Sequence, residues 1–298
     1  MGFKKMKKAY NASAKIMEKR MEKERPEDFQ ILKKVSKSSI VIVKGTYDKV
    51  ELVLDLINIP YLLIDSNQFN QIELNPNQIL IINCPGNGME ESLTKIKDFV
   101  KQGGFLFTTD WALSTILEQI FPDFLKYNQR PTQDDCVAVE IVDKNNKFLE
   151  GIFKADEKPI WWLESSSYPI QILDPKKVQI LVKSEEMKQK YGQDPIVITF
   201  NYGDGGTVLH MTSHYYLQRS ELRTNRHMKS AADYAMEEMA FSKEEVMEIE
   251  KELNGVSLGE AESAYSTTQF LGNVIIEQQK KVNKRLTKKK SVENKESK

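Results

Sequence analysis

The chain has 298 residues, which is enough for one large α/β domain or for two smaller ones. Lysine plus arginine balance aspartate plus glutamate at 43 each, so no net charge draws the protein to nucleic acid or to acidic membranes. The chain has only two cysteines, its N-terminus does not resemble a signal peptide, and no apolar run is long enough to span a bilayer. Together these features predict a cytoplasmic protein without a membrane partner.

The first half of the chain alternates between strand and helix patterns. Residues 1–35 predict a charged N-terminal helix. Short apolar runs rich in β-branched residues then predict buried strands, with helical spacing between them. These strands are expected at 39–43, 61–64, 78–82 and 104–108. Such alternation is typical of a parallel sheet covered by helices on both faces.

The second half is richer in strands. They are predicted at 137–142, 159–163, 178–182, 195–200 and 207–211, and the last two are joined by a glycine-rich hairpin turn. Helices are expected over 226–253, with a break at Phe241-Ser242, and over 260–281. We therefore predict four parts: an N-terminal helix (1–35), an α/β domain (36–222), a helical extension (223–283) and a disordered basic tail (284–298).

Two segments together resemble a known family. One is the helix, Gly-Gly, strand and turn at 91–113; the other is the hairpin at 195–214, which ends in His214. The chain resembles the class I glutamine amidotransferase-like superfamily, closest to its ThuA-like branch, over roughly residues 38–220. The resemblance implies a flavodoxin-like parallel sheet with an antiparallel extension, which here is flanked by the N- and C-terminal helices.

The resemblance also shows what this chain lacks. Active family members carry a cysteine at the turn after the fourth strand and a His-x-Glu after a late strand. Here Asp110 occupies that turn, and His214 is followed by Tyr215 and Tyr216. Glutamine amidotransferase activity is therefore not expected. Related domains that lack the triad act as binding or assembly modules.

Three residues are candidates for catalysis. In parallel sheets ligands bind outside the carboxyl ends of the strands, and Asp110 and His214 follow predicted strands. They are candidates for an acid–base pair or for two metal ligands. Alternatively, Asp110 caps the next helix and His214 is a structural histidine. Cys84, after the third strand, is a candidate nucleophile with His214 as its base, or a core cysteine.

Further candidates would bind a ligand. Trp111 follows Asp110 and either contacts a ligand or packs beneath the later strands. Trp161 and Trp162 point to opposite sides of an extended segment, so that one is buried and the other is free for a partner or a sugar ring, with Glu164 beside it. Tyr215 and Arg219 lie in a segment of aromatic and basic residues that contacts phosphate or forms internal salt bridges. No cofactor and no metal are predicted.

These features lead to three hypotheses. The first is a non-catalytic pseudoenzyme that binds protein partners through its terminal helices. The second is a hydrolase-type enzyme that acts on a small polar ligand with Asp110 and His214 at the strand edge. The third is a sugar-binding protein that uses Trp161 or Trp162. Close approach of Asp110 to His214 favours the second, and an Asp110 that caps its helix favours the first.

Overall fold

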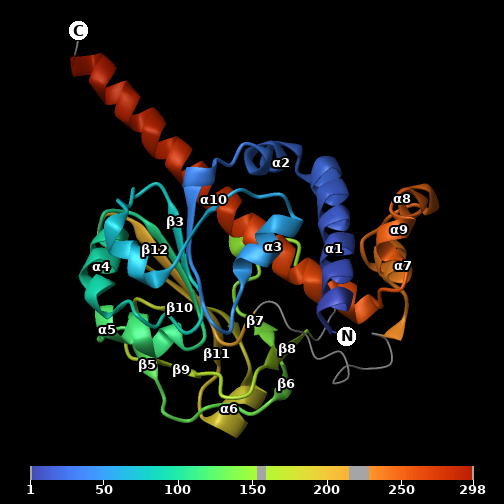
Figure 1. The fold of residues 1–298 in the computed structure, drawn as a ribbon, viewed down its shortest axis with the longest axis horizontal. Helices are drawn as coiled ribbons and strands as arrows, with labels where there is room; N and C mark the ends of the chain where they lie inside the picture. Colours follow the sequence, from blue (N-terminus) through green and yellow to red (C-terminus); the bar gives the residue numbers. More distant parts are fainter. Residues whose placement is uncertain (1, 153–158, 215–227, 297–298) are drawn as a thin grey trace.

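The computed structural model describes residues 2–152, 159–214 and 228–296. Eight strands form one mixed sheet in the order β2-β1-β3-β4-β12-β11-β10-β7 (Figure 1). The first five are parallel and the last three are antiparallel. Their bounds are Ile40–Val43 (β1), Leu62–Ile64 (β2), Ile79–Ile82 (β3), Phe105–Thr109 (β4), Glu140–Ile141 (β7), Gln179–Lys183 (β10), Pro195–Tyr202 (β11) and Gly206–Met211 (β12). The predicted flavodoxin-like parallel sheet with an antiparallel extension is confirmed.

Two smaller antiparallel pairs lie beside this sheet. One pairs Leu125–Tyr127 (β5) with Ile170–Ile172 (β9), and the other pairs Asp135–Ala138 (β6) with Ile160–Leu163 (β8). The single strand predicted over 137–142 is thus divided, because β6 pairs with β8 whereas β7 joins the edge of the large sheet. The strands β5 and β9 have three residues each, which is too short for a clear alternating pattern.

Alternate residues of the parallel strands enter two separate cores. Ile40 and Ile42 face one core, and Val41 and Val43 face the other. Helices α1 (Gly2–Glu24), α2 (Pro26–Lys33), α3 (Val50–Leu56), α7 (Ala231–Asp233), α9 (Glu250–Leu253) and α10 (Leu258–Glu296) contribute to the first core. The second core includes α4 (Leu93–Lys101), the π turn Leu113–Leu117 and α5 (Glu118–Ile120). The strands are apolar throughout because both faces are covered.

Both terminal helices belong to the first core. Ile16 and Met21 of α1 and Phe270 and Val274 of α10 are buried together, and Arg20 donates a 2.7 Å hydrogen bond to the Tyr265 hydroxyl. Figure 1 shows α10 crossing behind α3 toward α1, with its C-terminal end projecting beyond the body. The apolar sides of these helices are therefore used within the chain.

Helix α10 continues to Glu296, where we predicted a disordered tail from Lys284. The continuation has two causes. Lysine and arginine are good helix formers, and two basic side chains anchor the helix to loops at the start of β4 and β12. Lys281 donates to the Thr207 hydroxyl over 2.9 Å, and Arg285 donates to the Gly103 carbonyl over 3.2 Å.

The helix predicted over 226–253 is interrupted near Phe241-Ser242, as predicted. A π turn at Tyr234–Glu238 ends three residues before Phe241, and α8 (Lys243–Glu248) begins with Ser242 as its cap. Another helix, α6 (Glu185–Tyr191), was not predicted; Ser184 caps it and Gly192 ends it. Within the described ranges, no helix combines the length and the apolar character that crossing a membrane requires.

Buried His210 of β12 should make stability sensitive to acid. Burial lowers its pKa to about 3, and a hydrogen bond with the Thr108 backbone opposes this only partly. The Thr108 hydroxyl lies 2.8 Å from Nδ1. Its partners in the adjacent strands, Thr108 and Ile198, carry no charge. The unfolded chain, with a histidine pKa near 6.5, therefore binds more protons below that pH, and stability is lost from about pH 6.5 down to about 3.

We expect this histidine to cost about 1.4 kcal/mol of unfolding free energy for each pH unit below 6.5. Urea unfolding at pH 7.5, 5.5 and 4.5 measures the loss. Other carboxylates also titrate in this range, so the control is His210→Asn, whose amide reproduces a donor near the Nδ1 position. The variant should lose about 2 to 3 kcal/mol less than the parent between pH 7.5 and 4.5. Equal losses of unfolding free energy in the parent and in His210→Asn would show that His210 does not cause the acid sensitivity.

Candidate functional site

Four parallel strands bring their following residues to one edge of the sheet. Asp48 lies in the turn after β1, Cys84 follows β3, Asp110 follows β4 and His214 follows β12. Because β12 is parallel to β4, its carboxyl end lies beside that of β4. The expectation that these turns share one edge is confirmed, and the edge is where α/β sheets bind their ligands.

Cys84 is held in place by the turn after β1. The N–H groups of Thr46 and Tyr47 donate to the Cys84 carbonyl over 3.0 and 3.2 Å. A Cβ on Gly45 would lie 2.3 Å from the same oxygen, so only glycine allows this approach. The Cys84 side chain is fully buried. Although Cys84 lies outside the strands, its backbone is thus held in one position by the turn after β1.

Asp110 does not cap the helical turn that follows it. Its carboxylate accepts hydrogen bonds from the Tyr168 N–H over 2.7 Å and from the Ser167 hydroxyl over 3.0 Å. The predicted cap is absent because the Asp110 backbone is left-handed, with φ of 46°, and the carboxylate binds the segment 167–168 instead. A left-handed non-glycine residue is held there only by surrounding contacts. Asp110 is 1% exposed.

His214 lies between two carboxylates. Its Nε2 is 3.4 Å from Asp110 Oδ2, and its Nδ1 is bonded to the Glu164 carboxylate. The Glu164 N–H in turn donates to the Ser213 hydroxyl over 3.0 Å. The structure therefore brings Asp110 and His214 together. Glu164 reaches them because it follows β8, where its N–H bonds Ser213 after β12. It binds an imidazole, where we expected it beside a ligand of the tryptophans.

Asp48 is part of the cluster although the sequence did not single it out. Its side chain is buried and accepts from the Thr109 hydroxyl over 2.7 Å and from the Lys49 N–H over 2.8 Å. The signal was available: an acidic residue just after a buried parallel strand lies at the same edge as Asp110.

Burial and mutual charge shift the titration of this cluster. Burial raises the pKa of Asp110 to about 6, although His214 and the two hydrogen bonds oppose the rise. Burial opposes the charged form of His214, but contacts with Cys84 and Glu164 and the nearby Asp48 and Asp110 raise its pKa to about 11. Burial also raises the pKa of the Cys84 thiol and of Asp48. The centre of the cluster thus favours a positive charge.

Trp111 and the paired tryptophans all make hydrogen bonds within the chain. Trp111 Nε1 donates to the Ser166 carbonyl over 2.6 Å, and its ring stacks on Tyr168 with centroids 5.4 Å apart. Trp161 is half-buried and donates to the Thr212 carbonyl over 3.1 Å, and Trp162 is 8% exposed and donates to Asp134 over 2.7 Å. Trp162 is buried, but Trp161 is half-buried and hydrogen-bonded where we predicted an exposed side chain. The candidates Tyr215 and Arg219 lie outside the described residues.

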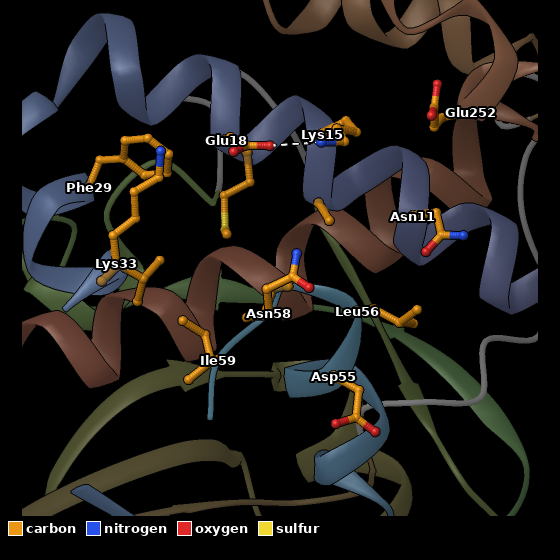
Figure 2. A pocket seen from close by; sticks show the side chains of 14 residues that line it. Asn11, Lys15, Glu18, Phe29, Lys33, Asp55, Leu56, Asn58, Ile59 and Glu252 are labelled. Atoms are coloured by element: carbon orange, nitrogen blue, oxygen red, sulfur yellow. Dashed lines mark hydrogen bonds and ion pairs between the residues drawn. The ribbon is translucent and has the colours of Figure 1, made fainter. Parts of the chain in front are cut away.

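A separate hollow of about 530 Å³ lies between α1, α2 and α3. Figure 2 shows Lys15 and Glu18 of α1, joined as an ion pair, on one side of it, and Asp55 and Asn58 on the other. None of the predicted site residues lines this hollow. Its size alone does not make it the functional site, because the clustered titratable groups are at the carboxyl edge of the sheet.

Comparison with known proteins gives weak structural similarity only. A ThuA-like protein from Bacteroides uniformis aligns with 59% of this chain and 82% of its own, with 9% identity and a TM-score of 0.41. A catalytic mutant of a GH42 β-galactosidase from G. stearothermophilus (15% identity, TM-score 0.38) and a β-galactosidase from Bacillus circulans (10%, 0.39) align with 59% and 62% of this chain. The chain spans only 27% and 30% of these two galactosidases. The sequence matches no family model and no curated protein.

Proposed function

We propose that the chain is a small-molecule enzyme of the hydrolase type whose reaction centre is the cluster of Asp110, His214, Glu164 and Cys84. The observation that carries the proposal is the 3.4 Å approach of His214 Nε2 to Asp110 Oδ2 at the carboxyl edge of the sheet, with Glu164 behind the imidazole. Two acid–base groups with a third that orients one of them form the arrangement that proton-transfer sites share.

The burial of the cluster supports the same conclusion. Side chains of Asp110 and His214 are 2% and 6% exposed, and the Cys84 thiol is buried beside them. Removing ionised groups from water costs several kcal/mol each, so packed apolar residues would serve stability equally well or better. Groups with shifted pKa values that gather at a strand edge are characteristic of functional sites.

In the proposed reaction the positive charge at the centre of the cluster polarises the bond that is cleaved. The Asp110 carboxylate accepts the proton of the attacking water. Glu164, bonded to Nδ1, keeps Nε2 of His214 directed at the centre. Water attacks the polarised atom and its proton passes to Asp110. Protonated Asp110 then gives this proton to the leaving group as the bond breaks, so the cluster returns to its starting charge.

The other two hypotheses have less support from the site. A sugar-binding tryptophan beside a free Glu164 is not favoured, since both indole N–H groups and the Glu164 carboxylate already have partners. Binding of a protein through the terminal helices remains a proposal. It requires the outward, charged sides of α1 and α10, because their apolar sides are buried in the first core, where α1 packs against α10.

Turnover by the full chain tests the proposal. The purified protein is assayed against ester, amide, phosphoester and glycoside substrates and against a metabolite extract read by mass spectrometry. Asp110→Asn and His214→Gln should each lower the observed turnover by roughly 10²- to 10⁴-fold, because each removes a proton-transfer group. The control is Asp123→Asn, which changes an exposed carboxylate. No turnover in any assay, or full turnover by both folded variants, would reject the proposal.

A further inference from the structure

We propose that Cys84, Asp110 and His214 bind one divalent transition-metal ion, of which Zn²⁺ is the best match, through Cys84 Sγ, a carboxylate oxygen of Asp110 and His214 Nε2. These ligand atoms all lie within 4.8 Å of one another. They come from the ends of β3, β4 and β12, so the sheet itself holds them at one point. The inference departs from our expectation from the sequence that the chain binds no metal.

The spacing of the ligand atoms fits a tetrahedral ion. Zinc bonds of ~2.0 to 2.3 Å at tetrahedral angles place neighbouring ligand atoms ~3.3 to 3.8 Å apart. The 3.4 Å between His214 Nε2 and Asp110 Oδ2 lies within that range. The Cys84 sulfur has at most about an ångström to move, which a rotation of roughly 35° about its Cα–Cβ bond supplies.

The groups around the ligands orient them as in known metal sites. Histidines that bind a metal nearly always bond their second nitrogen to a carboxylate or a carbonyl, and Glu164 holds Nδ1 of His214 in this way. Oδ1 of Asp110 accepts from the Tyr168 N–H over 2.7 Å, which leaves Oδ2 facing the imidazole. Glu164 is itself positioned by Ser213. His214 and Asp110 thus each have a hydrogen-bond partner on the atom that does not face the proposed ion.

An unpaired nitrogen is the second, independent observation. Within the described residues, His214 Nε2 is buried and has no partner at full hydrogen-bond geometry; Asp110 Oδ2 is 3.4 Å away and the Cys84 sulfur lies within 4.8 Å. Buried polar atoms without partners are rare and costly in folded proteins. A metal ion bound at this point would give the nitrogen a partner.

The types of ligand select the metal. A thiolate and an imidazole favour zinc and similar ions over magnesium or calcium, which bind through oxygen. Three protein ligands leave a fourth position for water, as in catalytic zinc sites, and such a water ionises near neutral pH. With the ion bound, Asp110 and His214 would be its ligands, so the ion would supply the positive charge of the proposed reaction and its ionised water would be the nucleophile. The inference therefore deepens the proposed function and rests on it only for the role of this water. Binding itself can be measured without any substrate.

Metal content and cobalt spectra test the site in the full chain. Protein purified without chelators should contain about one zinc per chain by elemental mass spectrometry. After chelation, added Co²⁺ should give the intense visible bands of a tetrahedral ion and the near-ultraviolet band of a cobalt–thiolate bond. Cys84→Ser should remove the thiolate band, and Glu164→Gln, which loosens the orientation of His214, should weaken binding by roughly 10- to 100-fold.

The matched control is Cys136→Ser, which replaces the chain's other cysteine and should leave both spectra unchanged. Circular dichroism confirms that each variant is folded. The inference is overturned if the folded parent takes up neither zinc nor cobalt, or if Cys136→Ser and not Cys84→Ser removes the thiolate band. Stoichiometric metal without turnover would support the site and reject the hydrolase. Turnover that survives complete chelation would support the hydrolase and reject the role of the metal-bound water in the reaction.

Discussion

Replacing Phe270 with alanine is expected to lower the free energy of unfolding by about 3 to 5 kcal/mol. Phe270 belongs to α10, is 5% exposed, and its ring centroid lies 6.0 Å from that of Phe107 in β4. The substitution leaves a cavity between the helix and the sheet that the surrounding strands cannot close. Equilibrium unfolding in urea, followed by circular dichroism, measures the loss.

The control is on the same helix. Leu286 is 44% exposed, so Leu286→Ala should change stability by less than about 0.5 kcal/mol. If Phe270→Ala unfolds α10 alone and leaves the sheet intact, the helix is a separate extension, as the sequence indicated, and its burial in the first core is refuted. A single cooperative transition at lower urea concentration is the expected outcome.

Gly45→Ala is expected to lose about 3 kcal/mol of stability and to disturb the site. The added Cβ would lie 2.3 Å from the Cys84 carbonyl and 2.6 Å from Asn83 Cβ, and neither can move without shifting the end of β3. The same shift would displace the Cys84 sulfur. Urea unfolding measures the first effect, and the reactivity of the Cys84 thiol toward a disulfide reagent in a Cys136→Ser background measures the second.

Gly205→Asn is the comparison for this glycine substitution. Nothing lies within 4 Å of a Cβ at Gly205, and asparagine tolerates its left-handed backbone, with φ of 86°, better than most residues. We expect less than about 1 kcal/mol of change there. Equal, small losses at both positions would show that the turn after β1 is not pressed against Cys84.

The sequence was most informative where strands are buried on both sides. Continuous runs such as Ile40–Val43 and Ile79–Ile82 identify parallel strands by themselves, because both faces must be apolar. Turns with glycine, such as the one that joins β11 to β12, identify the hairpin. The short strands β5 and β9 could not be found, since three residues carry no periodicity and they pair only through contacts with distant residues.

The candidate site was predictable only in part. Asp110 and His214 could be placed at one edge because each directly follows a strand. The partnership of Glu164 with His214 could not be predicted, because it depends on where β8 passes the end of β12. The left-handed backbone at Asp110, which directs its carboxylate away from the next helix, is likewise set by tertiary contacts.

The ligands of the cluster are contributed by strands that lie far apart along the chain. Cys84 and Asp110 follow neighbouring strands β3 and β4, but His214 arrives only after the whole second half of the sheet has been passed. Closing so long a loop is entropically costly and slow, so β12 should insert between β4 and β11 late in folding. The half-site of Cys84 and Asp110 is then present before the histidine, and the completed cluster is a marker of the fully folded chain.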